Sequence, residues 1–143
     1  MGVPMRLLSV FTLLALCFVS SSGSVASRNA AEQPDISRSG SDFLEVCSTI
    51  DRERKGDDPV RIHNDATCLG WVEGFADGFI VHDELLGVSE KDRMVCMPRR
   101  IAATQIVRAI KKYIADNPEK AHRATRYIAS VALARAFPCK ART

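Results

Sequence analysis

Beyond residue 40, apolar side chains recur with the period of α-helices, and no segment alternates with period two for the length of a strand. The first predicted helix opens at Asp42, whose side chain can cap the first turn while Glu45 completes a capping box. The helix leads through residues 51–54 into a turn-rich loop at residues 55–59. Its apolar face consists of Phe43, Leu44, Cys47 and Ile50.

A second helix is predicted from Asn64 or Asp65, which are both good caps, to about Glu84. Its apolar positions are Cys68, Val72, Phe75, Phe79 and either Val81 or His82.

Three glycines, Gly70, Gly74 and Gly78, form a further stripe along the second helix. A glycine inside a helix costs about 1 kcal/mol relative to alanine, so three in register indicate close approach of another backbone. Charged residues interrupt the stripe, which argues against a membrane contact. We therefore expect a helix–helix seam in a folded core or in a dimer.

A third helix is predicted between Pro98 and Asp116, with a broad apolar face and a basic face opposite. The apolar face comprises Ile101, Gln105, Ile106, Ala109, Ile110, Tyr113 and Ile114, and the basic face Arg108, Lys111 and Lys112. The run Asn117-Pro118-Glu119 then predicts the start of a fourth helix, with a cap, a proline at the first helical position and an acid in the first turn. That helix buries Ala121, Ala124, Ile128, Val131, Ala132 and Phe137, and it stops before Pro138.

The segment between the second and third helices is charged and ends at a cysteine. Such a segment is usually a solvated connection, but it is also the best candidate for a rigidly presented contact loop. On exposure alone, the predicted partner-binding residues are Glu84, Glu90, Lys91, Asp92 and Arg93.

The chain begins with the pattern of a secretory signal peptide over residues 1–26. Its apolar run at residues 7–19 has 13 residues, too few for a membrane span of roughly 20. An alternative is a lipoprotein signal acylated at Cys17, although Leu16 is large for the position before that cysteine. Residues 27–40 are polar and aperiodic, so we expect a disordered tether there and a folded domain over residues 41–140.

Removal of the leader leaves Cys47, Cys68, Cys96 and Cys139, an even number in a chain bound for an oxidising compartment. Two disulfides follow, and three connectivities are open. An antiparallel hairpin of the first two helices favours Cys47–Cys68, and the ends of the last two helices favour Cys96–Cys139. The alternative of a zinc site with His63, His82 or His122 lacks a close cysteine pair.

Charge is divided unevenly along the chain. Residues 27–97 hold 8 basic and 15 acidic residues, a net charge of −7, whereas residues 98–143 hold 11 basic and 2 acidic residues, a net charge of +9. The two halves can pack together and partly neutralise each other, or the basic half can face an anionic partner. Nucleic acid is a poor candidate for that partner, because the basic half has few aromatic residues and no recognisable binding module.

No pattern of residues indicates a catalytic centre, and we expect neither a metal nor another cofactor. A cysteine hydrolase needs a free thiol, which an even set of paired cysteines does not supply. His82 and Asp83 with Asp77 could form a base and its orienting group, but no Gly-x-Ser-x-Gly turn accompanies them. Trp71, the only tryptophan, is placed in the core in preference to an interface.

Several motifs in fixed order resemble the Rap/Tai family of immunity proteins, over about residues 42–140. They lie in residues 68–78, 96–98, 105, 113–119 and 132–139, and include Gly70, Trp71, Gly74, Asp77, Gly78, Pro98, Gln105, Pro118, Phe137 and Pro138. The chain departs from that family at Arg100 and Ala102, where a glycine and a threonine are usual, and so lacks a cap for the third helix.

The resemblance implies a periplasmic or secreted antidote to a type VI secretion effector, often dimeric, with no catalysis of its own. The effector would be a papain-like amidase that cuts peptidoglycan peptides, and the antidote would block its cleft. Two other interpretations remain open. One is a periplasmic stress chaperone that unfolds with pH; the other is a basic module that binds the cell envelope in a salt-dependent manner.

Overall fold

The computed structural model describes residues 34–52, 56 and 58–139, and over these residues it contains four α-helices and no strand. The helices are α1 (Gly40–Val46), α2 (Pro59–Leu85), α3 (Ala103–Asp116) and α4 (Thr125–Ala136), with short 3₁₀ helices η1 (Glu90–Asp92) and η2 (Pro118–Lys120). The prediction of an all-α fold with four helices is confirmed. The predicted signal peptide at residues 1–26 and residues 27–33 of the predicted tether lie outside the described residues.

The packed domain begins ahead of the predicted boundary at residue 41. Ile36 is buried in the core, and the Ser37 carbonyl accepts a hydrogen bond of 3.3 Å from the Thr125 amide. The tether prediction is therefore wrong for residues 34–40. The predicted cap Asp42 is also wrong, because the Ser39 side chain accepts from the Asp42 amide and so caps α1. Leu44, predicted on the buried face, is exposed.

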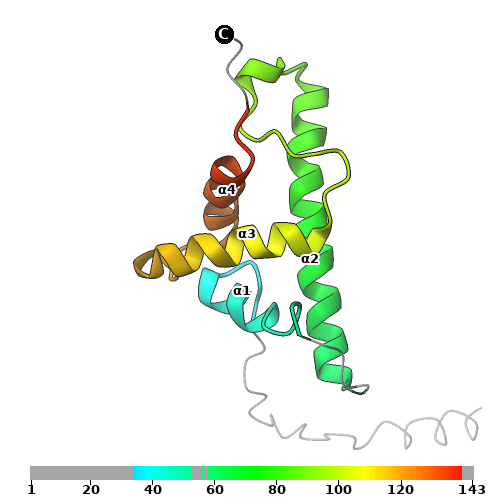
Figure 1. Cartoon of the computed structure of the whole chain (residues 1–143), viewed down its shortest axis with the longest axis vertical. Helices are drawn as coiled ribbons and strands as arrows, with labels where there is room; N and C mark the ends of the chain where they lie inside the picture. The colour runs from blue at the N-terminus through cyan, green and yellow to red at the C-terminus, as the bar shows by residue number, and fades with distance from the viewer. Residues whose placement is uncertain (1–33, 53–55, 57, 140–143) are drawn as a thin grey trace, which may run out of the picture. The chain divides into compact units, whose positions relative to one another are not determined.

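Helix α2 begins earlier than predicted because Asp58 and Pro59 form its first turn. The Asp58 side chain accepts from the Val60 amide, and proline at the first helical position has the backbone angle that a helix needs. The predicted caps Asn64 and Asp65 lie within the helix. Figure 1 shows α2 as one long helix with α1, α3 and α4 on one side of it.

The core lies where α3 packs against α4 and the middle of α2, and where α1 packs against α2 and α4. Its largest fully buried side chains are Phe43, Val72, Val107, Ile110, Ile128 and Leu133. Gly40 allows α1 to approach α4 closely, because a Cβ atom there would lie 2.5 Å from Ile128 Cδ1 and 3.1 Å from the Ala121 carbonyl oxygen. The apolar face predicted for α3 is confirmed at Ile106, Ile110, Tyr113 and Ile114.

The Asn117-Pro118 sequence does not open α4, which begins at Thr125. Asn117 instead ends α3, where its side-chain Nδ2 donates to the Tyr113 carbonyl at 2.9 Å, and Pro118 starts the turn η2. At the other end of α3, Ala102 has no capping side chain, and Gln105 Oε1 accepts from the Ala102 amide at 3.3 Å. Gln105 thus makes one half of a capping box, while the half in which a threonine hydroxyl would accept from the Gln105 amide is missing.

Both predicted disulfides are confirmed. Cys47 joins Cys68 and fastens the end of α1 to α2, with both residues fully buried. Cys96 joins Cys139 and fastens the segment before α3 to the residues that follow α4.

Candidate functional site

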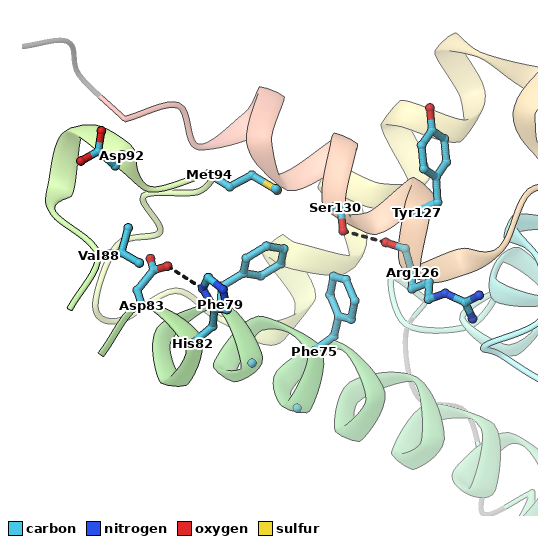
Figure 2. Close-up of a pocket in the computed structure, with 12 residues that line it drawn as sticks. Phe75, Phe79, His82, Asp83, Val88, Asp92, Met94, Arg126, Tyr127 and Ser130 are labelled. Carbon is cyan, nitrogen blue, oxygen red and sulfur yellow. Dashed lines mark hydrogen bonds and ion pairs between the residues drawn. The ribbon is translucent and has the colours of Figure 1, made fainter. Parts of the chain in front are cut away.

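A groove of about 720 Å³ lies between the C-terminal half of α2, residues 88–94 and the first turns of α4 (Figure 2). Figure 2 shows Phe75 and Phe79 pointing from α2 toward α4, while Met94 extends from the loop toward the same helix. The lining residues are Gly74, Phe75, Gly78, Phe79, His82, Asp83, Val88, Asp92, Met94, Arg126, Tyr127 and Ser130. The groove is therefore mostly apolar, with charged residues among its borders.

An aromatic row connects the core to the groove. The ring of Phe43, which is fully buried, meets Trp71 edge-on at 6.0 Å, and Trp71 stacks on Phe75 at 5.0 Å between centroids. Phe75 in turn meets Phe79 edge-on at 5.5 Å. Because the three α2 residues are spaced by four, they lie on one face of the helix. The row holds Phe75 and Phe79 in place at the groove wall, and Trp71 packs against the core as predicted.

The loop that forms the second wall is attached to α2 through Asp83. The Asp83 carbonyl accepts from the Val88 amide at 2.9 Å, and its carboxylate pairs with Arg93 Nε at 3.5 Å and His82 Nδ1 at 3.1 Å. Gly87, with φ of +60°, makes the turn that ends α2. Beyond the loop, Cys96 is held by its disulfide and by a 2.9 Å hydrogen bond from its amide to the Phe137 carbonyl. The loop is thus fixed at both ends.

The glycine stripe does not lie at a seam inside the domain, so the prediction is wrong for the core, and a seam between two copies stays a prediction. Gly70, Gly74 and Gly78 are all exposed, and a Cβ atom at any of them would have no neighbouring atom within 4 Å. Gly74 and Gly78 border the groove, whereas Gly70 lies outside it. The backbone approach that the stripe suggests is therefore not made within the described residues.

The predicted contact residues Glu84, Glu90, Lys91, Asp92 and Arg93 are all exposed near the end of α2. Glu84, Glu90 and Arg93 border a second, smaller cavity of about 300 Å³, and Asp92 borders the groove. The structure therefore brings four of the five to two adjoining hollows, with Lys91 lining neither.

Large apolar side chains are exposed beside these hollows. Met94 is 61% exposed and Leu85 is 80% exposed, and Ile80, Val81 and Leu86 at the end of α2 are exposed as well. Exposed apolar side chains next to a groove and a charged loop are typical of a surface that binds another protein.

The two oppositely charged halves of the chain meet at Asp51. Its carboxylate pairs with Arg108 Nε at 2.7 Å and Lys111 Nζ at 3.4 Å, both on α3. The hydrogen bond from Arg108 holds the pKa of Asp51 below its usual value. Just before α4, the exposed Arg123 lies over the Tyr127 ring at 5.1 Å, and on α4 the exposed Arg126 borders the groove.

Three of the remaining motif residues lie next to the second disulfide. Phe137 is partly buried and supplies the carbonyl bound by Cys96, while Pro98 and Pro138 lie on the surface beside the two bridged cysteines. Asp77 is exposed on α2.

Within the described part of the chain, no cluster of three metal-ligating side chains occurs. None of the helices described there has the length and apolarity to span a bilayer.

The helices, the two disulfides and the motif positions correspond to a known family. A protein-family model described as Rap1a immunity proteins matches residues 39–139. The chain belongs to the Rap1a immunity protein family. The match extends from Ser39, the cap of α1, to Cys139 of the second disulfide, so the Rap1a domain includes α1 to α4 and both bridges. No curated protein and no solved structure matches the chain.

The sequence predicted where the charged loop of this Rap1a domain lies between α2 and α3, but not the groove beside it. Met94, Arg126 and Tyr127 were not predicted as site residues, because the groove forms only when α4 is folded against the loop and α2. The available signal was the stripe of glycines, which marked one border of the groove.

Proposed function

We propose that this Rap1a family member is an exported, periplasmic immunity protein that binds a type VI secretion effector and blocks it without catalysis. The effector is a papain-like peptidoglycan amidase. Family membership supports the immunity role, and the two disulfides support a location in an oxidising compartment. The amidase target follows from the resemblance of the motifs.

The observation that carries the proposal is the fixed, exposed segment between Asp83 and Cys96. It carries charged side chains on a loop held by an ion pair, a backbone hydrogen bond and a disulfide. A loop already held in one conformation loses little entropy on binding. We infer that Glu84, Glu90, Lys91, Asp92 and Arg93 contact the amidase and hold this segment over its cleft, so that the peptidoglycan peptide cannot enter.

Inhibition is the direct test. The oxidised mature protein is added to a papain-like peptidoglycan amidase from the same organism, and muropeptide release is followed by chromatography. We expect stoichiometric inhibition by the oxidised protein. Full amidase activity at a large excess of the protein would contradict the proposal and favour an envelope-binding or chaperone role instead.

The contact residues are tested by replacing all five with serine. Because Arg93 also holds Asp83, a second variant keeps Arg93 and changes only the other four. We expect both variants to lose most of their inhibition. Replacement of the exposed pair Lys112 and Asp116 on α3 with serine serves as the control and leaves inhibition intact. Unchanged inhibition by the five-residue variant would refute this choice of contact surface.

Self-association is a second proposal for the partner. Beside the groove, the exposed Gly70, Val81 and Leu85 share one face of α2, and a second copy would cover this face. Sedimentation equilibrium of the oxidised protein over a range of concentrations tests this proposal. A monomer at all concentrations would refute it.

A further inference from the structure

We propose that the groove beside the loop receives an amphipathic α-helix of the partner, lying antiparallel to α2. The helix places its N-terminus at the Asp92 end of the groove and its C-terminus at the Arg126 end. This inference rests on the proposed function for the identity of the partner. It deepens that function by assigning a second contact region and the chemistry of the segment that fills it.

The floor of the groove favours a helix over an isolated side chain. Gly74 and Gly78 lie one helical turn apart, both exposed, with open space where their side chains would be. Gly40 is different, because a Cβ atom there would collide with Ile128. A glycine destabilises a helix relative to alanine, and close packing inside the domain explains why Gly40 is a glycine nonetheless. It does not explain Gly74 and Gly78. A partner backbone lying across these two positions accounts for them.

The walls are apolar and leave room for several side chains. Phe79 forms one wall, and the exposed Met94 and Tyr127 form the others. A volume of about 720 Å³ is that of a pocket able to hold a ligand much larger than one aliphatic side chain. A helix that binds in a groove inserts apolar side chains, called anchors, that are three or four residues apart in its sequence. Gly74 and Gly78 of α2 are also four residues apart. The anchors would therefore be leucine-like residues at positions i and i+4.

The two ends of the groove differ in charge, and this sets the direction of the helix. Figure 2 shows Asp92 at one end and Arg126 at the other. Asp83 lies near the Asp92 end, but its carboxylate is already paired with Arg93 and His82. A helix carries partial positive charge at its N-terminus and partial negative charge at its C-terminus. The acidic end of the groove therefore attracts the N-terminus, and Arg126 attracts the C-terminus together with an acidic residue in the last turn.

Filling the groove with a side chain tests the proposal, and the stripe provides its own control. Gly78→Leu places a side chain in the groove, and Gly70→Leu makes the same change on the same face of α2 outside it. Leucine favours the helix over glycine, so both variants are expected to fold at least as stably as the wild type, which circular dichroism checks. We expect Gly78→Leu to weaken binding to the amidase by at least ~30-fold, and Gly70→Leu by no more than about threefold.

A charge reversal tests the orientation. Arg126→Glu at the end of the groove is compared with Arg99→Glu, the same change at an exposed position outside it. We expect Arg126→Glu to slow association several-fold at low salt and to reduce its dependence on salt, while Arg99→Glu leaves both unchanged. Equal effects of the two reversals would overturn the proposed orientation.

Failure of the groove and failure of the proposed function give different results. If the wild type inhibits the amidase and Gly78→Leu inhibits it equally well, the groove is not the site and the immunity role stands. If the wild type binds no amidase, the groove is tested with a synthetic helical peptide that has leucines at i and i+4, a lysine near its N-terminus and a glutamate near its C-terminus. Emission from Trp71, which stacks on Phe75 of the groove wall, reports binding.

A peptide with the lysine and glutamate exchanged is the control for charge. The exchanged peptide is intrinsically more helical, because its charges then favour the helix dipole, so weaker binding cannot be ascribed to lost helicity. Saturable binding of the first peptide that is lost in Gly78→Leu and kept in Gly70→Leu supports the groove. No binding of either peptide to the wild type, or equal binding of both, overturns the proposal.

Discussion

Alanine at two glycines of this domain is expected to change stability in opposite directions. At Gly78 the added Cβ meets no atom within 4 Å, so only the helix propensity changes, and the variant gains up to about 1 kcal/mol. At Gly40 the Cβ would lie 2.5 Å from Ile128 Cδ1, whereas carbon atoms pack at about 3.5–4.0 Å. Ile128 is fully buried, and the Gly40 amide is held by the Arg123 carbonyl at 3.1 Å, so neither side can move freely.

Overpacking of a closed core costs about 1–3 kcal/mol, so the two variants should differ by about 2–4 kcal/mol in free energy of unfolding. For a domain of this size, 1 kcal/mol moves the melting temperature by about 4–8 °C. Thermal unfolding followed by circular dichroism should therefore place Gly78→Ala above the wild type and Gly40→Ala below it. A lower melting temperature for Gly78→Ala would refute the conclusion that this face of α2 is open in the free protein.

Three further perturbations test the bridge, the α1 cap and the core. Replacing Cys96 and Cys139 with alanine opens a ring whose ends are 43 residues apart. We expect the free energy of unfolding, measured by urea titration, to fall by about 4 kcal/mol, and amidase inhibition to weaken. Unchanged inhibition would show that the bridge does not hold the contact loop. The hydrogen bonds from Arg38 and Ser39 lower the pKa of Asp42 to about 2, so the carboxylate stabilises the fold above about pH 4 and this contribution is lost as pH falls toward 2. Asp42→Asn should lower the free energy of unfolding by about 1–2 kcal/mol at pH 7 and leave it unchanged near pH 2. Equal losses at both pH values would show that the ionised carboxylate is not the source of this stability. Phe43→Ala should cost about 3–5 kcal/mol and shift Trp71 emission, because the two rings are in contact.

Local sequence signals predicted the helices and the disulfides, because both follow from spacing along the chain. Cys47 lies at the end of the first helix and Cys68 was expected early in the second, so an antiparallel hairpin of the two favoured their pairing. The errors occurred where two local signals competed. Asp58-Pro59 can make either a turn or the first turn of a helix; here the Asp58 side chain caps the helix and Pro59 occupies its first position. Asn117-Pro118 signals a helix start, but there Asn117 caps the end of α3.

The groove could not be predicted from local signals, because its borders come from three separate parts of the chain. Nothing near Met94 or Tyr127 in the sequence shows that they line the same groove beside α2. The glycines indicated that a backbone should approach α2, but not whether that backbone was internal or belonged to a partner. That distinction depends on which face of α2 the other helices cover, which is a property of the whole fold.

The order of the two disulfides along the chain bears on how the protein matures. Of the four bridged cysteines, the first along the chain pairs with the second and the third with the fourth, so the two covalent rings share no residue. When such a chain enters an oxidising compartment N-terminus first, Cys68 is the next of these thiols to arrive after Cys47, and Cys139 the next after Cys96. An oxidant that simply joins consecutive cysteines would therefore produce the native bonds, and maturation would need no later reshuffling by an isomerase.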